Sequence, residues 1–405
     1  MKRRLATIAS VLVLALVGAA CGGGDDEGGS GSGGSDLEKI PLSITFQGAL
    51  SGPYSYLITP SFQGAQIRID ELNADESFPA EITLEQGDTQ GDPANAPPVV
   101  EKASTNPDTV AIIGPGFSGE SAASGDTYDE AGIPFVTPSA TATSLGEEGW
   151  EYWYRGCGND AGQGGLAGTY IAESLKPANL FVAHDKSDYG QPLAETVRDT
   201  ADQGGVEQVG FEGVEAGADD YSSLISAIEA AGAEAFFFGG YDADFGKIVK
   251  QARDAGVDIP MMSGDGSLSS TFIDLAGAGA DNVTLIAPTN IGGDFVDKYN
   301  TEVGGDASSV PIYAGEGYDI ASMFGEGIKQ AREDGLEDPE EIRTAIKEYL
   351  DSLVGGEGSF DGEAKTYAWD ETHELSEEVG TLFYLYEVNG GEINPLGTAA
   401  EALGS

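Results

Sequence analysis

From residue 40 onward, short apolar runs alternate with amphipathic helical patterns, and this alternation constrains the fold more than any other feature of the sequence. The runs are rich in Val, Ile, Leu and Phe and are bounded by Gly, Pro or Asp, which is typical of buried parallel strands. They occupy residues 42–46, 81–84, 109–113, 180–183, 235–238 and 283–286. A shorter strand is expected near 134–137, and a late strand is expected at Phe383, Leu385 and Tyr386.

The segments between these runs carry apolar residues at helical spacing. The four clearest stripes are Phe62-Ala65-Ile69-Leu72, Leu193-Val197-Ala201, Tyr221-Leu224-Ile225-Ile228 and Phe245-Ile248-Val249-Ala252. Asp219 or Asp220 is expected to cap the third helix, and Gly256 to end the fourth. Two more helices are expected near 316–333 and 338–352. The pattern predicts an α/β fold with parallel sheets covered by helices on both faces, and its length favours two lobes over one very wide sheet.

A glycine-rich loop follows the third strand and has the dinucleotide-binding spacing G-x-G-x-x-G at residues 114–119. A dinucleotide site also needs an acidic residue at the end of the next strand to bind the ribose. That strand, near 134–137, is followed by Pro138 and Ser139, so the sequence argues against a nicotinamide cofactor. The loop still places backbone N–H groups and the Ser118 hydroxyl at a helix N-terminus, which suits a small anion such as a carboxylate.

No arrangement of catalytic residues emerges from the sequence. The residues around Ser118 read G-F-S-G-E and do not form the G-x-S-x-G elbow of serine hydrolases. His184 ends a strand and His373 lies in an acidic segment, and neither is placed as a general base. Two cysteines and two histidines are too few for a zinc cluster. We therefore expect a protein that is not an enzyme and has no metal or cofactor.

The N-terminus has the features of an export signal followed by a tether. Basic residues at 2–4 precede an apolar run at 5–20, which is too short to span a bilayer. The run ends in Gly18-Ala19-Ala20-Cys21 and resembles a bacterial lipoprotein signal, in which the cysteine is lipidated; the usual Leu is replaced by Gly18. The alternative is an ordinary secretory signal. Residues 21–37, rich in Gly, Ser and Asp, are expected to be a flexible tether between an anchored Cys21 and an extracytoplasmic body.

The net charge excludes one class of partner. The chain has 69 acidic and 19 basic residues, a formal charge of -50. Affinity for nucleic acid depends on Lys and Arg that displace counterions from phosphate, so nucleic-acid binding is not expected. The same charge opposes binding to an anionic membrane surface. It also suggests a salty habitat, where repulsion between like charges is screened.

A series of short motifs occurs in fixed order over residues 40–395. The motifs are Leu50-Ser51-Gly52-Pro53, Phe62-x-Gly64, Asp88-x-x-x-Asp92-Pro93, the loop at 114–118, Thr137-Pro138-Ser139-Ala140-Thr141-Ala142, Ala183-His184-Asp185-Lys186-x-x-Tyr189-Gly190, Gly239-Gly240-Tyr241, Gln251-Ala252-Arg253-x-Ala255-Gly256 and Trp369-Asp370. With these motifs the chain resembles the branched-chain amino-acid-binding proteins of ABC importers, which have the type I periplasmic-binding-protein fold.

The resemblance implies an architecture and a partner. It implies two doubly wound parallel-sheet lobes joined by a three-crossing hinge, with a small amino acid held between the lobes and delivered to a membrane permease. Lobe 1 would comprise residues 38–157 and 288–356, and lobe 2 residues 158–287 and 357–405. The protein would act as a monomer.

The resemblance also implies roles for individual residues of lobe 1. Ser118 matches the hydroxyl that binds the ligand's α-carboxylate together with backbone N–H groups. Ser139, Ala140 and Thr141 match the loop that contacts the α-ammonium and α-carboxylate through a carbonyl, a hydroxyl and an N–H. A zwitterion needs both donors and acceptors, so these groups fit the chemistry.

In lobe 2, Tyr189 and Tyr241 match aromatic residues that close over the ligand, and Asp265 matches the acid that pairs with its α-ammonium. Tyr56 and Phe117 are further candidates. A tyrosine of the family aligns with Leu57, and many relatives have Glu at the position of Asp265. The identity of the ligand therefore stays open between aliphatic amino acids and amide- or urea-type solutes. A role in presenting ligand to a membrane receptor is a further alternative.

Overall fold

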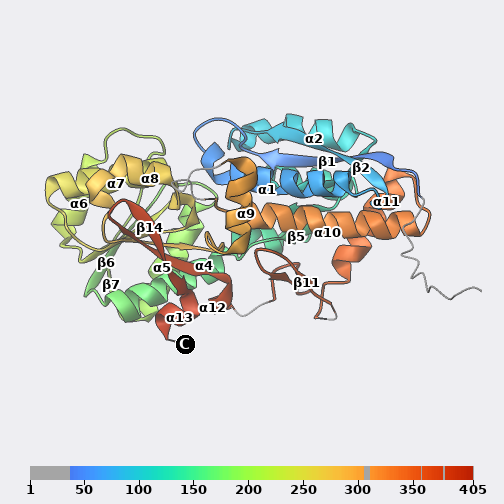
Figure 1. Ribbon diagram of the computed structural model, residues 1–405. Helices are drawn as coiled ribbons and strands as arrows, with labels where there is room; N and C mark the ends of the chain where they lie inside the picture. The colour runs from blue at the N-terminus through green and yellow to red at the C-terminus, as the bar shows by residue number, and fades with distance from the viewer. Residues whose placement is uncertain (1–36, 305–310, 357, 377–378, 405) are drawn as a thin grey trace, which may run out of the picture. The chain divides into compact units, whose positions relative to one another are not determined.

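The computed structural model describes residues 37–304, 311–356, 358–376 and 379–404 (Figure 1). The predicted signal peptide at 1–20 lies outside the described residues, as do Cys21 and nearly all of the tether at 21–37. The described chain contains two large sheets. No helix in this part of the chain combines the length and the apolar composition of a membrane span.

The first sheet has five strands, all parallel, in the order β2-β1-β3-β4-β5. Every residue of β3 is buried, as expected for a strand covered on both faces. The strands predicted at 42–46, 81–84, 109–113 and near 134–137 are confirmed. The observed bounds are β1 Ile40–Gly48, β2 Ala80–Asp88, β3 Thr109–Ile113, β4 Phe135–Thr137 and β5 Trp153–Arg155.

Helices from two distant parts of the chain pack on the first sheet. In Figure 1 the orange α10 lies alongside the blue α1, although about 240 residues separate the end of α1 from the start of α10. Two glycines permit this close approach, because a Cβ on Gly64 would lie 2.0 Å from the Ala314 carbonyl oxygen and one on Gly317 2.0 Å from that of Ser61. The helices are α1 Ser55–Ala74, α2 Ala96–Thr105, α3 Ser118–Glu130, α10 Ala314–Glu333 and α11 Pro339–Asp351.

The second sheet has seven strands in the order β14-β13-β10-β9-β8-β6-β7. β6 to β10 are parallel, whereas β13 runs antiparallel to β10 and to β14. The parallel strands predicted from the sequence form the body of this sheet, and β13 and β14 add an antiparallel edge to it. The chain reaches the sheet where Tyr384 pairs with Ala287, at the carboxyl end of β10, so it must run back along that strand. The bounds are β6 Asn179–His184, β7 Glu207–Gly213, β8 Ala235–Gly239, β9 Met261–Ser263, β10 Val283–Ala287, β13 Tyr384–Asn389 and β14 Glu392–Thr398.

The predicted helices of this second part are present, with one difference at a cap. Gly256 ends α7 in the left-handed conformation with φ 89°, as expected. The N-cap of α6 is Tyr221 instead of Asp219 or Asp220, although the Asp220 carboxylate accepts a hydrogen bond from the Ser222 N–H. The helices are α4 Asp160–Tyr170, α5 Gly190–Gln203, α6 Ser222–Ala231, α7 Asp242–Ala255, α8 Ser270–Ala276, α12 Val379–Leu382 and α13 Ala399–Leu403, and one π-helical turn, Ile171–Leu175, follows α4. The helix α9, Asp294–Val303, packs instead against α1 and α10 of the first sheet.

The chain passes between the two sheets three times. The first pass follows β5, and the second follows β10 on the way to α10, which packs against α1. The third leads from α11 through a small hairpin, β11 Phe360–Asp361 and β12 Thr366–Tyr367, to β13. Loops at the carboxyl ends of parallel strands form binding sites in open α/β sheets. The loops after β3, β4, β6, β8 and β9 carry nearly all of the predicted site residues.

Candidate functional site

Loops from both sheets meet around one small cavity. All but two of the predicted ligand-binding residues line it, the exceptions being Ala140 and Tyr56. Its volume is about 10 Å³, close to the least that holds a single water molecule. A solute of amino-acid size can enter only if the residues of the second sheet move away from those of the first. The lining residues are Leu57, Gly116, Phe117, Ser118, Ser139, Thr141, Tyr189, Tyr241 and Asp265.

The first-sheet side of the cavity presents hydroxyls and backbone groups. Ser118 begins α3, and its Oγ accepts a hydrogen bond from the Ala142 N–H at 3.1 Å, so its own hydrogen can still be donated. Ser139 Oγ donates to the Gly116 carbonyl at 2.8 Å. Thr141 is 1% exposed, and its Oγ1 has no hydrogen-bond partner among the described residues. This side therefore offers uncharged donors and acceptors beside a helix N-terminus.

Glu120 lies directly behind this side, in the first turn of α3. Its carboxylate is fully buried and accepts a hydrogen bond from the Thr89 hydroxyl. Burial raises the pKa of Glu120 from 4.5 to about 7, although the Thr89 hydroxyl opposes the shift. The first-sheet side is thus uncharged in acid and gains a negative charge near neutral pH.

The second-sheet side is acidic and aromatic. Asp265 is 2% exposed, and its carboxylate accepts hydrogen bonds from the Gln163 amide at 2.8 Å, the Tyr189 hydroxyl at 2.8 Å and the Tyr313 hydroxyl at 2.7 Å. Burial raises the pKa of Asp265, and the same three donors oppose the rise. The rings of Tyr189 and Tyr241 lie 5.3 Å apart between their centroids and form the adjoining wall. This side can pair with a cation and cover an apolar group.

Three residues near the cavity were missed by the sequence reasoning: Asp160, Gln163 and Tyr313. Asp160 is 1% exposed, both of its carboxylate oxygens lack a hydrogen-bond partner in the described structure, and burial together with the charge of Asp265 raises its pKa well above 3.8. Its spacing from Gln163 places both in the first turn of α4, which Asn159 caps by accepting from the Gly162 N–H. The pair Asn159-Asp160 is a typical helix start, and it could have indicated from the sequence that a helix begins here. Tyr313 gives no local signal, because only the fold brings it to Asp265.

Ala140 and Tyr56 lie next to the cavity instead of on its wall. The Ala140 carbonyl accepts a hydrogen bond from Arg155 Nη1. The Tyr56 hydroxyl donates to the Gly266 carbonyl at 2.7 Å and so links α1 to the loop after β9. Tyr54 extends the aromatic wall, with its ring centroid 5.0 Å from that of Tyr241.

The glycine-rich loop at 114–119 is explained by packing. A Cβ on Gly114, where φ is 121°, would lie 2.4 Å from the Gln47 carbonyl oxygen. A Cβ on Gly119 would lie 2.7 Å from the Pro93 side chain. These close approaches require glycine whether or not a phosphate binds, so the match to the dinucleotide motif carries no functional weight.

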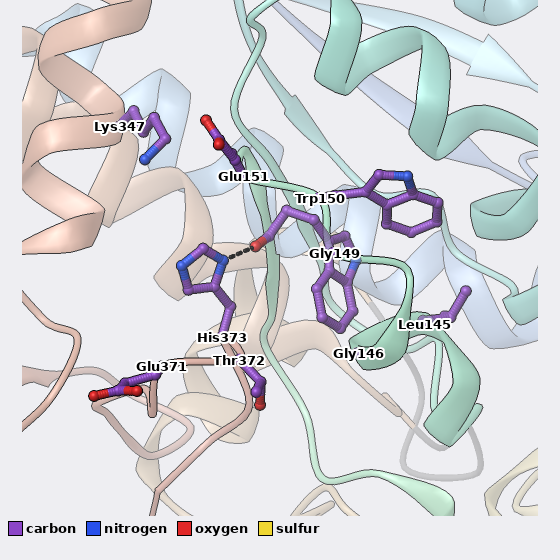
Figure 2. A pocket seen from close by; sticks show the side chains of 10 residues that line it. Leu145, Gly146, Gly149, Trp150, Glu151, Lys347, Glu371, Thr372 and His373 are labelled. Atoms are coloured by element: carbon purple, nitrogen blue, oxygen red, sulfur yellow. Dashed lines mark hydrogen bonds between the residues drawn. The ribbon is translucent and has the colours of Figure 1, made fainter.

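A larger cavity of about 340 Å³ lies elsewhere, between the loop at 145–153, Lys347 of α11 and residues 371–373 (Figure 2). None of the predicted site residues, all of them described except Cys21, lines it. Figure 2 shows the ring of His373 hydrogen-bonded to a backbone carbonyl, that of Trp153, at 2.7 Å. The other histidine, His184, accepts from the Lys186 N–H through Nδ1 at 3.1 Å. Both histidines are therefore bound to backbone groups.

Comparisons with known proteins identify the family of the chain. A sequence profile of the family described as "Periplasmic binding protein" matches residues 41–392. The curated Leu/Ile/Val/Thr-binding protein of Salmonella typhimurium is 32% identical over 250 residues, which cover 62% of this chain and 68% of that protein. The profile match extends over both sheets.

Two solved structures have a fold similar to that of this chain. A leucine binding protein from Thermotoga maritima superposes with a TM-score of 0.76 at 21% identity, covering 87% of this chain and 97% of that one. A branched-chain amino acid transporter substrate binding protein from Streptococcus pneumoniae, solved in complex with isoleucine, gives 0.74 at 24% identity, covering 89% and 99%. The predicted fold class is thereby confirmed.

Proposed function

The chain belongs to the periplasmic binding protein family, and we propose that it captures a branched-chain or other aliphatic amino acid between its two sheets and delivers it to an ABC import permease. The observation that carries this proposal is the division of one cavity into a hydroxyl-rich side and an acidic, aromatic side. An α-amino acid has a carboxylate, an ammonium and a side chain within a few bonds of one another. The cavity offers a matching group for each.

Each part of the ligand has an assigned partner in the proposal. The α-carboxylate accepts hydrogen bonds from the Ser118 hydroxyl and from N–H groups at the start of α3. The α-ammonium pairs with the Asp265 carboxylate and donates to the Thr141 Oγ1, which has no partner within the described structure. An aliphatic side chain packs against Leu57, Phe117 and Tyr241. The names of the relatives, which bind leucine, isoleucine and valine, support this assignment.

Capture proceeds by closure. The amino acid first binds to one side, and the passes between the sheets then bend so that the other side completes the contacts. The ligand favours the closed arrangement because only there does it meet both sides, and its differential affinity shifts the equilibrium. In this scheme Tyr56 and Gly266 join the two sides directly.

The same proposal covers location and chemistry. The body is held outside the cytoplasm by the lipidated Cys21 and the tether at 21–37, and it acts as a monomer. It catalyses no reaction. Cys21 can be tested by labelling cells with a radioactive fatty acid, since Cys21→Ala should abolish label incorporation and release the protein from the membrane fraction.

The decisive experiment is calorimetric titration of the mature chain, residues 21–405, after copurified solute has been removed by unfolding and refolding. L-leucine, L-isoleucine and L-valine should bind with micromolar dissociation constants, about −8 kcal/mol. Isopentylamine has the structure of leucine without the carboxylate, and 4-methylpentanoate that of leucine without the ammonium. Each should bind at least tenfold more weakly than leucine. Binding of amides or ureas without any aliphatic amino acid would contradict the proposal.

A further inference from the structure

One arginine at the end of β5 is completely buried and is hydrogen-bonded to two loops. The Arg155 side chain is 0% exposed. Its Nε and Nη2 donate to the two carboxylate oxygens of Glu374, both at 2.8 Å, in a bidentate ion pair. Its Nη1 donates to the Ala140 carbonyl, and its Nη2 to the Ala142 carbonyl at 2.9 Å. A buried guanidinium is tolerated when its charge is paired and its N–H donors have acceptors. Here Glu374 pairs with the charge, and four hydrogen bonds are made to oxygen atoms.

The two carbonyls that Arg155 binds flank Thr141. Thr141 and Ser139 line the cavity, so fixing Ala140 and Ala142 fixes the direction in which their hydroxyls point. We call residues 139–142 the ligand loop. The Ala140 N–H also donates to Thr137 Oγ1 at 2.9 Å, so both ends of this short loop are held from the first sheet.

Glu374 belongs to the segment 369–375, which lies on the third pass between the sheets. This segment is bound to Arg155 through the backbone as well. The Arg155 N–H donates to the His373 carbonyl at 3.1 Å, and the Trp369 indole donates to the Arg155 carbonyl at 2.7 Å. The ion pair therefore joins the ligand loop to a segment that must bend when the two sides of the cavity separate.

The same carboxylate reaches the second-sheet side of the site. Glu374 Oε2 accepts from the Asn159 amide at 3.0 Å, and Asn159 caps α4. Gln163 in the first turn of α4 donates to Asp265. A single, partly buried carboxylate thus connects the ligand loop with the helix that supports the acid on the opposite wall.

We propose that Arg155 is a positioning residue for the ligand loop and that its ion pair with Glu374 couples the geometry of this loop to the third pass between the sheets. The proposal rests on the proposed amino-acid binding. The ligand loop meets the α-carboxylate and the α-ammonium, which all amino acids share. Loss of the ion pair should therefore weaken the binding of every amino acid by the same factor and leave the selectivity among ligand side chains unchanged.

The test uses Glu374→Gln, which keeps the shape of the side chain and removes its charge, and Arg155→Lys, which keeps the charge and removes the bidentate geometry. Each should raise the dissociation constants of L-leucine and L-valine about tenfold with an unchanged ratio between them. Glu374→Asp, which keeps the charge, should recover part of the lost affinity.

Arg332→Lys is the matched control, because Arg332 is also buried and binds the backbone carbonyls of Pro79, Glu38 and Leu336 away from the cavity. It should destabilise the fold without changing the leucine dissociation constant.

A second readout does not need a ligand. Hydrogen exchange of the Ala140 and Ala142 amides should be faster in Glu374→Gln than in the wild type, and unchanged in Arg332→Lys. Unchanged exchange in Glu374→Gln, or an equal loss of leucine affinity in the Arg332→Lys control, would overturn the coupling. Absence of amino-acid binding by the wild type together with faster exchange in Glu374→Gln would instead refute the proposed function and keep the positioning role.

Discussion

The two sides of the cavity are built in different ways. On the first-sheet side, Ser118, Ser139 and Thr141 lie within 24 residues of one another, and the hydroxyls of the two serines are hydrogen-bonded to the backbone of neighbouring loops. On the second-sheet side, Asp265 is held by side chains from three separate parts of the chain, namely Gln163, Tyr189 and Tyr313. One side is local and uncharged except for Glu120 behind it, and the other is assembled over long distances around a charge.

This difference teaches which properties of the site are robust. Backbone groups recognise a carboxylate in the same way whatever side chains surround them, so the first-sheet side suits the part common to all amino acids. A buried carboxylate depends on every donor around it, because each missing hydrogen bond leaves charge without compensation. Changes on the second-sheet side should therefore have the larger effects on binding. The four predictions below test this contrast, from the largest free-energy change to the smallest.

The first prediction concerns the charge behind the first-sheet side. The pKa of the Glu120 carboxyl is about 7 in the folded protein, compared with 4.5 for an ordinary glutamate. The folded state therefore holds this proton more tightly than the unfolded state, and the resulting stabilisation is complete below pH 4.5 and is lost as the pH rises through 7. Glu120→Gln should remove this loss and leave the variant about 3 kcal/mol more stable relative to the wild type at pH 8 than at pH 4. Urea denaturation of both proteins at the two pH values measures it. Equal pH dependence in both proteins would contradict the assignment.

The second prediction concerns Asp265. Asp265→Ala should weaken binding of L-leucine by about 1.5–3 kcal/mol, the range for hydrogen bonds to a charged group. Asp265→Asn keeps the volume of the side chain and should lose a similar amount of leucine binding energy if the charge is the cause. Titration calorimetry with leucine and with 4-methylpentanoate separates the contributions, since the acid without an ammonium should bind no worse to the variants. Wild-type leucine affinity in Asp265→Asn would show that the ammonium has another partner.

The fold was more predictable than the site because its signals are local. Strands such as 109–113 and the helical stripe ending at Gly256 are encoded in consecutive residues, and both were predicted correctly from the sequence. The antiparallel direction of β13 was not predictable in this way. It follows from where the chain arrives after α12, at the carboxyl end of β10, and no short pattern encodes that.

For the site, motif resemblance supplied the residues on the wall but not their supports. Ser118 and Thr141 were predicted from loop motifs, and the structure places both on the cavity. Arg155, Gln163 and Tyr313 act through contacts that span 13 to 219 residues of sequence, so no window of the sequence connects them with the ligand loop or with Asp265. Buried polar partners of this kind become visible only when the sheets are assembled.

The third prediction measures the uncharged side. Ser118→Ala removes one hydroxyl donor and the acceptor of the Ala142 N–H, and it should weaken leucine binding by about 1.5 kcal/mol. Leucinamide lacks the carboxylate charge, so Ser118→Ala should weaken its binding less than it weakens the binding of leucine. Ser121→Ala is the control, because Ser121 is also buried in α3 and does not line the cavity. A larger effect for Ser118→Ala than for Asp265→Ala would reverse the contrast between the two sides.

The smallest expected effect lies where the two sides touch. Tyr56→Phe removes the hydrogen bond from the Tyr56 hydroxyl to the Gly266 carbonyl and should cost about 0.5–1 kcal/mol of leucine affinity. Because this contact forms only when α1 and the loop after β9 meet, its loss should speed ligand release and leave the association rate unchanged. Stopped-flow fluorescence, following the aromatic cluster around Tyr241, measures both rates. A slower association rate would mean that Tyr56 takes part in first contact with the ligand, which would place it on the first-sheet wall instead of on the closure contact.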